Sequence, residues 1–150
     1  MFALAQSQDE KIRYFGGKKL VEVSVRDEAL KQIKEKKEEI LVLKANVHNN
    51  VVVIHCYGEL DLYTVPQLEK LTNRYLDEEY AKIVIDLTET SYLDAETLRV
   101  FIRILSRVNQ ANLRLVMTPD ALIRKTFLIS GLKQYFLFTP SVQEALENLN

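Results

Sequence analysis

IVIDL at residues 83–87 and YLDAETL at residues 92–98 together predict the centre of the fold. The first segment is aliphatic apart from Asp86, which is typical of a strand that is buried on both faces of a sheet. The second segment opens a helix at Asp94, whose carboxylate can accept hydrogen bonds from the free amides of the first helical turn. A buried strand followed by a capped helix indicates an α/β domain.

The chain on either side of this centre alternates short apolar runs with helical periodicity, which predicts strands and helices interleaved in one sheet. Asn49 and Asn50 suit the positive φ of a tight connection, so residues 41–47 and 51–57 are expected to form a hairpin. Further strands are expected at residues 113–117 and 135–138.

Four helices are predicted from capping residues and apolar stripes, which gives the order β-β-α-β-α-β-α-β-α. The signals that start them are Thr64 with Gln67, Asp94, Thr118-Pro119 (a helix that Gly131 ends), and Ser141 with Glu144. The stripes expected to be buried are Leu68, Leu71 and Tyr75 on the first helix, and Leu98, Phe101, Ile102, Leu105 and Val108 on the second.

Two motifs carry a resemblance to a known family. Asp94-Ala95-Glu96-Thr97-Leu98 resembles the Asp-Ser-Ser-Gly-Leu helix start of the STAS domains of bacterial anti-sigma factor antagonists, and Gly58-Glu59-Leu60-Asp61 resembles their early strand end. The resemblance covers roughly residues 40–150. It implies a STAS-type α/β fold, a small mixed sheet with helices packed mainly on one side.

The same resemblance implies a regulatory function for this chain, with one change at the switch. STAS domains of this type bind an anti-sigma factor with a kinase-like fold, and phosphorylation of the first Ser of the motif cancels binding. Ala95 occupies that position here and cannot be phosphorylated. Thr97 and Ser91 are the nearest hydroxyls, and neither stands in the register of the phosphorylated Ser; whether either is modified stays open.

A partner-binding surface is expected at the start of the second helix and the loop bearing Asp61. Glu96 has two interpretations: a fixed charge that partly imitates a phosphate, or a residue favoured in a first helical turn. Arg99, Arg103 and Arg107 recur every four residues, either as a solvated face or as a cationic extension of the surface. The expected surface, with Asp61 and the arginines on exposed sides, comprises Asp61, Asp94, Glu96, Thr97, Arg99 and Arg103.

Charge and composition argue against other function classes. Twenty basic and 21 acidic residues give a formal net charge of -1, so no global field would hold nucleic acid. No run of about 18 apolar residues occurs, so no membrane insertion is expected. His48, His55 and Cys56 lack a metal-ligand spacing, because adjacent strand residues point to opposite faces. Neither a metal, a cofactor nor a catalytic residue is predicted; Cys56 is expected to be a buried thiol in a reducing cytoplasm.

Residues 1–39 are expected to form an N-terminal extension to a domain at residues 40–150. Residues 19–25 alternate enough for a short strand, and residues 26–39 form a helix pattern with a sparse apolar edge. The extension is either a docking or dimerisation arm, which would allow a homodimer, or a solvated helix lying against the domain or a mobile leader. A scaffold subunit of a signalling or transport complex is therefore the alternative function, with the extension as its assembly element.

Overall fold

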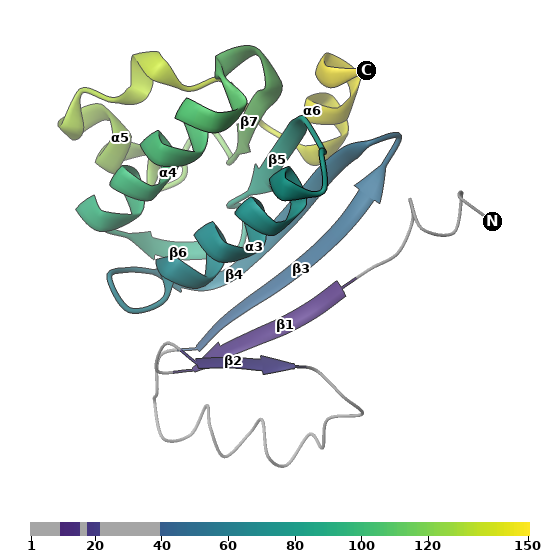
Figure 1. Ribbon diagram of the computed structural model, residues 1–150. Coiled ribbons are helices and arrows are strands. Elements are labelled where there is room, and N and C mark those ends of the chain that lie inside the picture. Colours follow the sequence, from purple (N-terminus) through teal and green to yellow (C-terminus); the bar gives the residue numbers. More distant parts are fainter. Residues whose placement is uncertain (1–9, 16–17, 22–39) are drawn as a thin grey trace.

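The computed structural model describes residues 10–15, 18–21 and 40–150, and Figure 1 shows their arrangement. The described strands are β1 (Glu10–Phe15), β2 (Lys18–Val21), β3 (Ile40–His48), β4 (Val51–Leu60), β5 (Lys82–Asp86), β6 (Thr90–Leu93), β7 (Leu113–Val116) and β8 (Phe138–Thr139). The described helices are α3 (Val65–Asp77), α4 (Ala95–Val108), α5 (Arg124–Ser130) and α6 (Val142–Leu149).

These strands form one mixed sheet in the order β2-β1-β3-β4-β5-β7-β8, with β6 paired to β4. The pairs β1 with β2, β1 with β3 and β3 with β4 are antiparallel, whereas β4, β5, β7 and β8 run parallel. As the aliphatic sequence predicts, β5 lies inside the sheet between β4 and β7, with Ile83, Val84 and Ile85 fully buried.

The helices divide unequally between the two faces of the sheet. On one face, α3, α4 and α5 bury the main core, whose largest side chains include Phe101 and Phe127, with ring centroids 6.1 Å apart. On the other face, α6 covers a smaller cluster of Val51, Val53 and Val84. The expected STAS-type mixed sheet with helices mainly on one side is thus confirmed (Figure 1).

Local signals placed several turns and caps correctly. Asn49 and Asn50 have φ values of 50° and 66° between β3 and β4, and Gly131 ends α5 in the left-handed conformation at φ 76°. The Ser141 hydroxyl accepts a hydrogen bond from the Glu144 amide, which caps α6. The α3 stripe of Leu68, Leu71 and Tyr75 is buried as predicted, and so are Leu98, Phe101 and Val108 on α4.

Three predictions about individual elements were wrong, and one strand was missed. Ile102 was expected in the buried stripe of α4 but is 36% exposed. Each residue of a helix is rotated by about 100° from the one before, which turns Ile102 away from the core that Phe101 and Ile104 enter. Residues 118–123 form successive turns, and α5 begins only at Arg124. Tyr135 belongs to a 3₁₀ turn rather than a strand. β6 was not predicted, since a four-residue strand with two exposed positions gives little pattern.

Part of the expected N-terminal extension belongs to the sheet. The predicted strand at residues 19–25 overlaps β2, while β1 was not predicted and pairs with β3 from Glu10 opposite Ala45 to Phe15 opposite Ile40. The helix predicted at residues 26–39 lies outside the described residues. Strand β3 is therefore an inner strand of the sheet.

Gly58 allows β4 to bend toward β6 near its end. Its φ is 119°, which L side chains rarely adopt, and a Cβ added there would lie 2.7 Å from the Ile40 carbonyl oxygen. The pairing register of β4 with β6 shifts between Gly58 and Glu59. The bend therefore depends on glycine, and it directs the strand end that leads into the loop at residues 61–64.

Replacing Gly58 by Ala is expected to lower the free energy of unfolding by about 3 kcal/mol, because backbone strain adds to the clash with Ile40. Urea denaturation measures the loss. Gly131→Ala is the matched control: its φ is also positive, but nothing lies within 4 Å of the added Cβ. It should cost only about 1 kcal/mol. Equal losses in both variants would show that the close approach to Ile40 has no energetic weight.

Candidate partner-binding site

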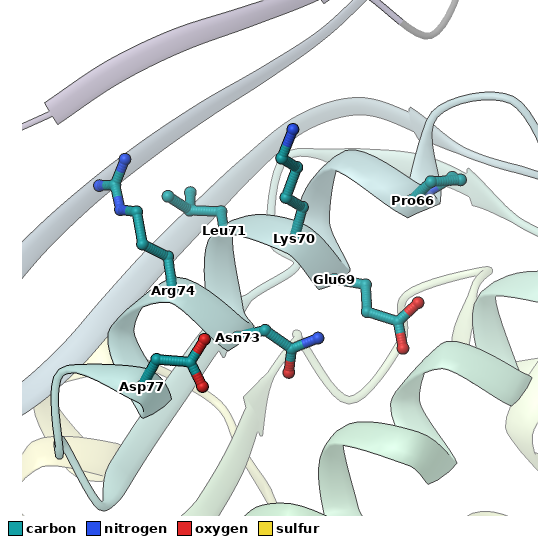
Figure 2. A pocket seen from close by; sticks show the side chains of 7 residues that line it. All are labelled: Pro66, Glu69, Lys70, Leu71, Asn73, Arg74 and Asp77. Carbon is teal, nitrogen blue, oxygen red and sulfur yellow. The ribbon is translucent and has the colours of Figure 1, made fainter.

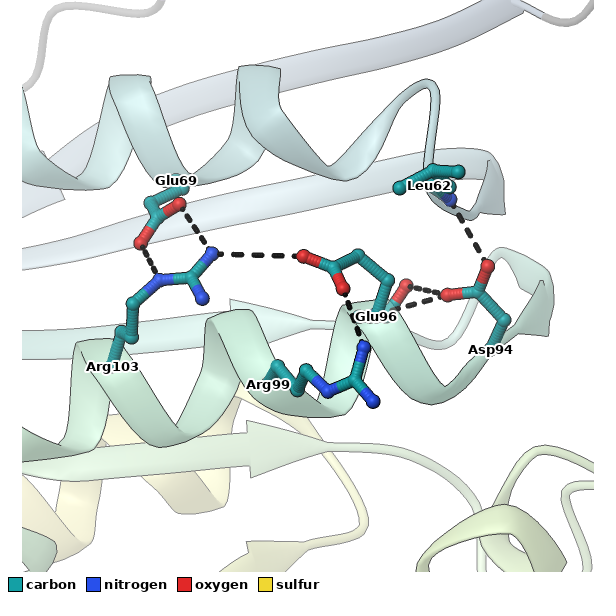
Figure 3. Close-up of polar contacts among 7 residues, drawn as sticks. Leu62, Glu69, Asp94, Glu96, Arg99 and Arg103 are labelled. Carbon is teal, nitrogen blue, oxygen red and sulfur yellow. Dashed lines mark hydrogen bonds and ion pairs between the residues drawn. The ribbon is translucent and has the colours of Figure 1, made fainter.

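Asp94 joins the start of α4 to the loop between β4 and α3. Its Oδ1 atom accepts a hydrogen bond from the Thr97 amide at 3.0 Å, which caps the helix as predicted. Its Oδ2 atom accepts one from the Leu62 amide at 3.0 Å. Figure 3 shows this carboxylate between the two elements. One side chain therefore fixes the distance between the helix start and the loop.

Asp61 organises the same loop from inside. Its side chain is 8% exposed, and its Oδ1 atom accepts hydrogen bonds from the amides of Tyr63 and Thr64 at 2.9 and 3.0 Å. The expectation that Asp61 lies on an exposed side was wrong, because these amides draw the carboxylate inward. Thr64 precedes α3 but makes no side-chain cap; its hydroxyl accepts from the Asp61 amide and donates to the Glu59 carbonyl.

Thr97 is a core residue of this site rather than a surface residue. Its side chain is fully buried, and its hydroxyl lies 2.8 Å from the Leu60 carbonyl oxygen and 3.0 Å from Asp94 Oδ1. Either oxygen can accept its proton. Thr97 thus connects α4 to the end of β4, and its hydroxyl is inaccessible in the folded chain.

Exposed apolar side chains surround these carboxylates. Leu62 is 55% exposed, Tyr63 66% and Tyr92 49%. They line a shallow cavity of about 250 Å³ together with Glu59, Asp61 and Asp94. We call Glu59, Leu62, Tyr63, Tyr92 and Asp94 the acidic aromatic surface.

Sequence reasoning named only Asp94 of this set. The apolar members stand next to motif residues in GELDLYTV and SYLDAETL, where an apolar residue is ordinarily assigned to the core. A signal was nevertheless present in the sequence. Leu62 and Tyr63 fall between Asp61 and Thr64 in a loop, where no strand or helix needs to bury them.

Two of the three arginines of the α4 stripe contact α3. Arg103 donates from Nε and Nη2 to the two carboxylate oxygens of Glu69, at 2.7 and 3.0 Å, and this pairing raises the pKa of Arg103. Arg107 donates to Asn73 and Asp77. The stripe is thus neither a purely solvated face nor a free cationic surface, because Arg103 and Arg107 tie α4 to α3 across the protein surface. Figure 3 shows the contact of Arg103 with Glu69.

Glu96 is neutralised by neighbours. Its carboxylate lies 3.0 Å from Arg99 Nη1 and 3.9 Å from Arg103 Nη2. A carboxylate held by two guanidinium groups is a poor imitation of a doubly charged phosphate. The contacts therefore favour the interpretation of Glu96 as a residue suited to a first helical turn, where a negative charge also interacts well with the helix dipole.

A second cavity, of about 490 Å³, opens along α3 and is shown in Figure 2. Glu69 and Asn73 extend toward α4 there, whereas Lys70 and Arg74 extend away from it. The described residues that line it all belong to α3, and two of them, Glu69 and Asp77, already bind the α4 arginines.

His55 and Asp86 form a polar pair on neighbouring parallel strands. His55 Nδ1 lies 2.6 Å from Asp86 Oδ2, and Thr88 donates to Asp86 Oδ1 from its amide and its hydroxyl. Burial acts to raise the pKa of Asp86, but the bonds from His55 and Thr88 outweigh it and lower the pKa. Burial, with the charge of Asp86 added, raises the pKa of the Cys56 thiol, so Cys56 is an inert core residue.

This pair predicts a loss of stability in acid. A carboxyl group with a folded-state pKa below its unfolded value stabilises the fold above the unfolded pKa, here about pH 4, and the contribution is lost as pH falls through the folded pKa. Urea unfolding between neutral pH and about pH 2 should show this decline. His55→Phe should make it shallower, whereas exposed Glu147→Gln on α6 should not. An unchanged slope in His55→Phe would contradict the assignment to this pair.

The described residues hold no group of three or more His, Cys, Asp or Glu side chains placed to bind a metal ion. Within that same part of the chain, no helix is long and apolar enough to cross a membrane. What the described residues present is a small α/β domain with an exposed acidic and aromatic surface at one end of its parallel strands.

Comparisons with known proteins agree with this architecture. The family model of the STAS domain matches residues 42–145, so the chain belongs to the STAS domain family. An anti-sigma-B factor antagonist of Staphylococcus epidermidis is 31% identical over 94 residues, which cover 62% of this chain and 87% of that protein. One from Staphylococcus aureus strain NCTC 8325 is 35% identical over 77 residues, covering 51% of this chain and 71% of the relative.

Solved structures show the same fold at lower sequence identity. An anti-sigma factor antagonist from Mycobacterium paratuberculosis superposes with a TM-score of 0.66 and 23% identity, covering 73% of this chain and 93% of that one. The unphosphorylated form of the anti-sigma factor antagonist SpoIIAA gives 0.58 and 21%, covering 71% and 95%. The resemblance inferred from the two sequence motifs is confirmed.

Proposed function

We propose that the chain is a non-enzymatic cytoplasmic regulator that binds an anti-sigma factor, or a related kinase-like protein, through the acidic aromatic surface. We further propose that phosphorylation at the start of α4 does not control this binding. Relatives in two staphylococcal species carry the name anti-sigma-B factor antagonist, which supports the partner class. A bacterial origin of the chain would agree with that partner.

The observation that carries the proposal is the double use of Asp94. By capping α4 and holding the Leu62 amide, it keeps Leu62 and Tyr63 exposed beside the helix start. Exposed apolar side chains are costly to hold in water, and a rigid aromatic cluster rimmed by charge is typical of an interface centre. In this proposal Leu62, Tyr63 and Tyr92 contact the partner, Asp61, Asp94 and Thr97 position them, and Glu96, Arg99 and Arg103 form the rim.

Independence from phosphorylation rests on the hydroxyl groups near α4. Ala95 is exposed at the first helical position and has no hydroxyl. Thr97 has one, but it is fully buried and hydrogen-bonded. Ser91 is exposed on β6, on the other side of Asp94 from the helix. None of the three offers a kinase an accessible hydroxyl in the register of the family's Ser.

The scaffold alternative depends on the N-terminal extension. We keep the division into residues 1–39 and residues 40–150 as a proposal, since the pairing of β1 with β3 joins part of the first to the sheet of the second. Such pairing supports a role of β1 as cover for the edge of β3. A homodimer through the extension would require contacts beyond these strands.

The test is a binding measurement on the full chain. Affinity capture with the immobilised full chain, followed by mass spectrometry, would identify partners, and calorimetry with the purified kinase-fold anti-sigma factor would measure the complex. We expect a 1:1 complex that excludes the sigma factor from its anti-sigma factor. No binding to a purified anti-sigma factor, together with stable incorporation into a larger assembly, would favour the scaffold function instead.

A further inference from the structure

A second exposed apolar surface lies on α5 and the segments beside it. Leu122 is 76% exposed, Leu128 53% and Ile129 87%. Lys125, four residues before Ile129 on α5, and Lys133, in the 3₁₀ turn that follows α5, are also exposed. We call these five residues the basic apolar surface. Its most protruding member, Ile129, has almost the whole of an aliphatic side chain in water, although Phe127 two residues earlier is fully buried in the core.

The charge of this region has one sign. Residues 121–143 contain Arg124, Lys125 and Lys133 and not one acidic residue. The Arg124 guanidinium lies over the Phe138 ring, 5.1 Å from its centroid. Among the described residues, neither Lys125 nor Lys133 has an acidic partner within ion-pair distance. These two cations are therefore available to an anionic surface from outside.

The acidic aromatic surface has the complementary composition. Glu59 and Asp94 supply negative charge there, and Leu62, Tyr63 and Tyr92 supply apolar contact area. These residues line a cavity of about 250 Å³ that is open to solvent and large enough for one aliphatic side chain. A protruding Ile129 with lysines near it in the chain matches a recess lined by carboxylates and apolar side chains in charge and in apolar character.

We propose that the basic apolar surface of one copy of this chain docks on the acidic aromatic surface of a second copy. Ile129 enters the recess between Tyr63 and Tyr92, and Lys125 and Lys133 face Glu59 and Asp94. Every copy carries both surfaces, so the contact joins unlike surfaces of two identical chains. If the acidic aromatic surface is also the partner site, as proposed above, self-association and partner binding compete, which provides a control that needs no phosphorylation.

The experiment uses one variant for each surface in the full chain. Tyr63→Lys places a cation in the acidic surface, and Ile129→Glu places an anion in the basic one. Sedimentation velocity over a concentration series should show concentration-dependent association of the parent. Each variant alone should associate at least about tenfold more weakly, because every contact between two of its copies includes one damaged surface. An equimolar mixture should form a 1:1 heterodimer, since one intact surface of each kind remains.

A control variant and a salt series test whether the association depends on these two surfaces and on their charges. Glu147→Gln changes an exposed charge on α6, on the other face of the sheet, and should associate like the parent. Raising the salt concentration should weaken the parent's association, because exposed charge pairs are screened. A parent that stays monomeric, or a dimer that neither variant weakens, would overturn the proposal. A dimer of the second kind would indicate that the N-terminal extension makes the contact.

Two further outcomes separate this proposal from its alternatives. If the parent is monomeric but cosediments with vesicles of anionic phospholipid, and Ile129→Glu does not, the basic apolar surface binds membranes and the proposed self-docking is wrong. Ile129→Glu should keep its affinity for the purified anti-sigma factor. Self-association that follows the mixing test without any anti-sigma binding would leave the present inference standing and remove the proposed function.

Discussion

Tyr63→Lys is expected to weaken binding of the anti-sigma factor by about 100-fold, or roughly 2.7 kcal/mol. Tyr63 is 66% exposed, sits in the loop that Asp94 and Asp61 hold, and borders the cavity at the centre of the acidic aromatic surface. Replacement removes a large apolar contact and buries a cation in the interface. Calorimetric titration of the purified partner measures the loss.

The same substitution should leave the fold intact. Exposed positions away from caps and ion pairs usually change the free energy of unfolding by no more than about 0.5 kcal/mol, so the melting curve should coincide with that of the parent. Ile129→Lys is the matched control, because it also replaces an exposed apolar residue by lysine. Binding that survives in Tyr63→Lys, or is lost equally in Ile129→Lys, would move the interface away from the loop.

Arg103→Glu, by contrast, is a poor probe of binding. Its guanidinium makes two hydrogen bonds to Glu69 on α3, so charge reversal sets two carboxylates against each other across the helix pair. A loss of affinity in that variant would mix displacement of α4 with loss of a contact. Surface pairs of this kind are worth only about 1 kcal/mol or less, but repulsion adds to the loss.

The sequence alone predicted more of the core than of the candidate site. The position of β5 followed from five residues, because an aliphatic run needs no knowledge of its neighbours. The cap at Asp94 was equally local. By contrast, β6 exists only through parallel pairing with β4, and Arg103 meets a carboxylate 34 residues away. Such pairings depend on the path of the chain in space, which the periodicity of one segment does not contain.

The exposed apolar residues mark the other limit of sequence reasoning. Tyr92 and Leu93 are adjacent in SYLD, yet Tyr92 is 49% exposed and Leu93 is buried. Alternation on a strand makes one of them face water, but which one depends on the register of β6 against β4. The motif residues therefore indicated the region of the candidate site, whereas the exposed side chains of the acidic aromatic surface became apparent only in the structure.

Ala95→Ser is expected to create a phosphorylation site. Ala95 is exposed at the first position of α4, and in the proposed alignment with the family motif it takes the place of the first Ser. With ATP and a kinase-type anti-sigma factor, the parent should gain no phosphate in this segment, whereas Ala95→Ser should approach one phosphate per chain. Intact mass and peptide mass spectrometry count and locate it. Ala81→Ser, another exposed alanine changed in the same way, should stay unmodified.

Phosphorylated Ala95→Ser should then bind its partner at least about tenfold more weakly than the unphosphorylated variant. The free amides and the helix dipole at the start of α4 can accommodate the phosphate. The phosphate nevertheless brings nearly two negative charges to a position beside Asp94 and close to Glu59. That excess charge must be desolvated when the partner covers the surface. Phosphate on Thr97 of the parent would contradict the proposal that phosphorylation does not control binding. Such a modification would require the Thr97 hydroxyl, which is fully buried and hydrogen-bonded, to become accessible without unfolding of α4.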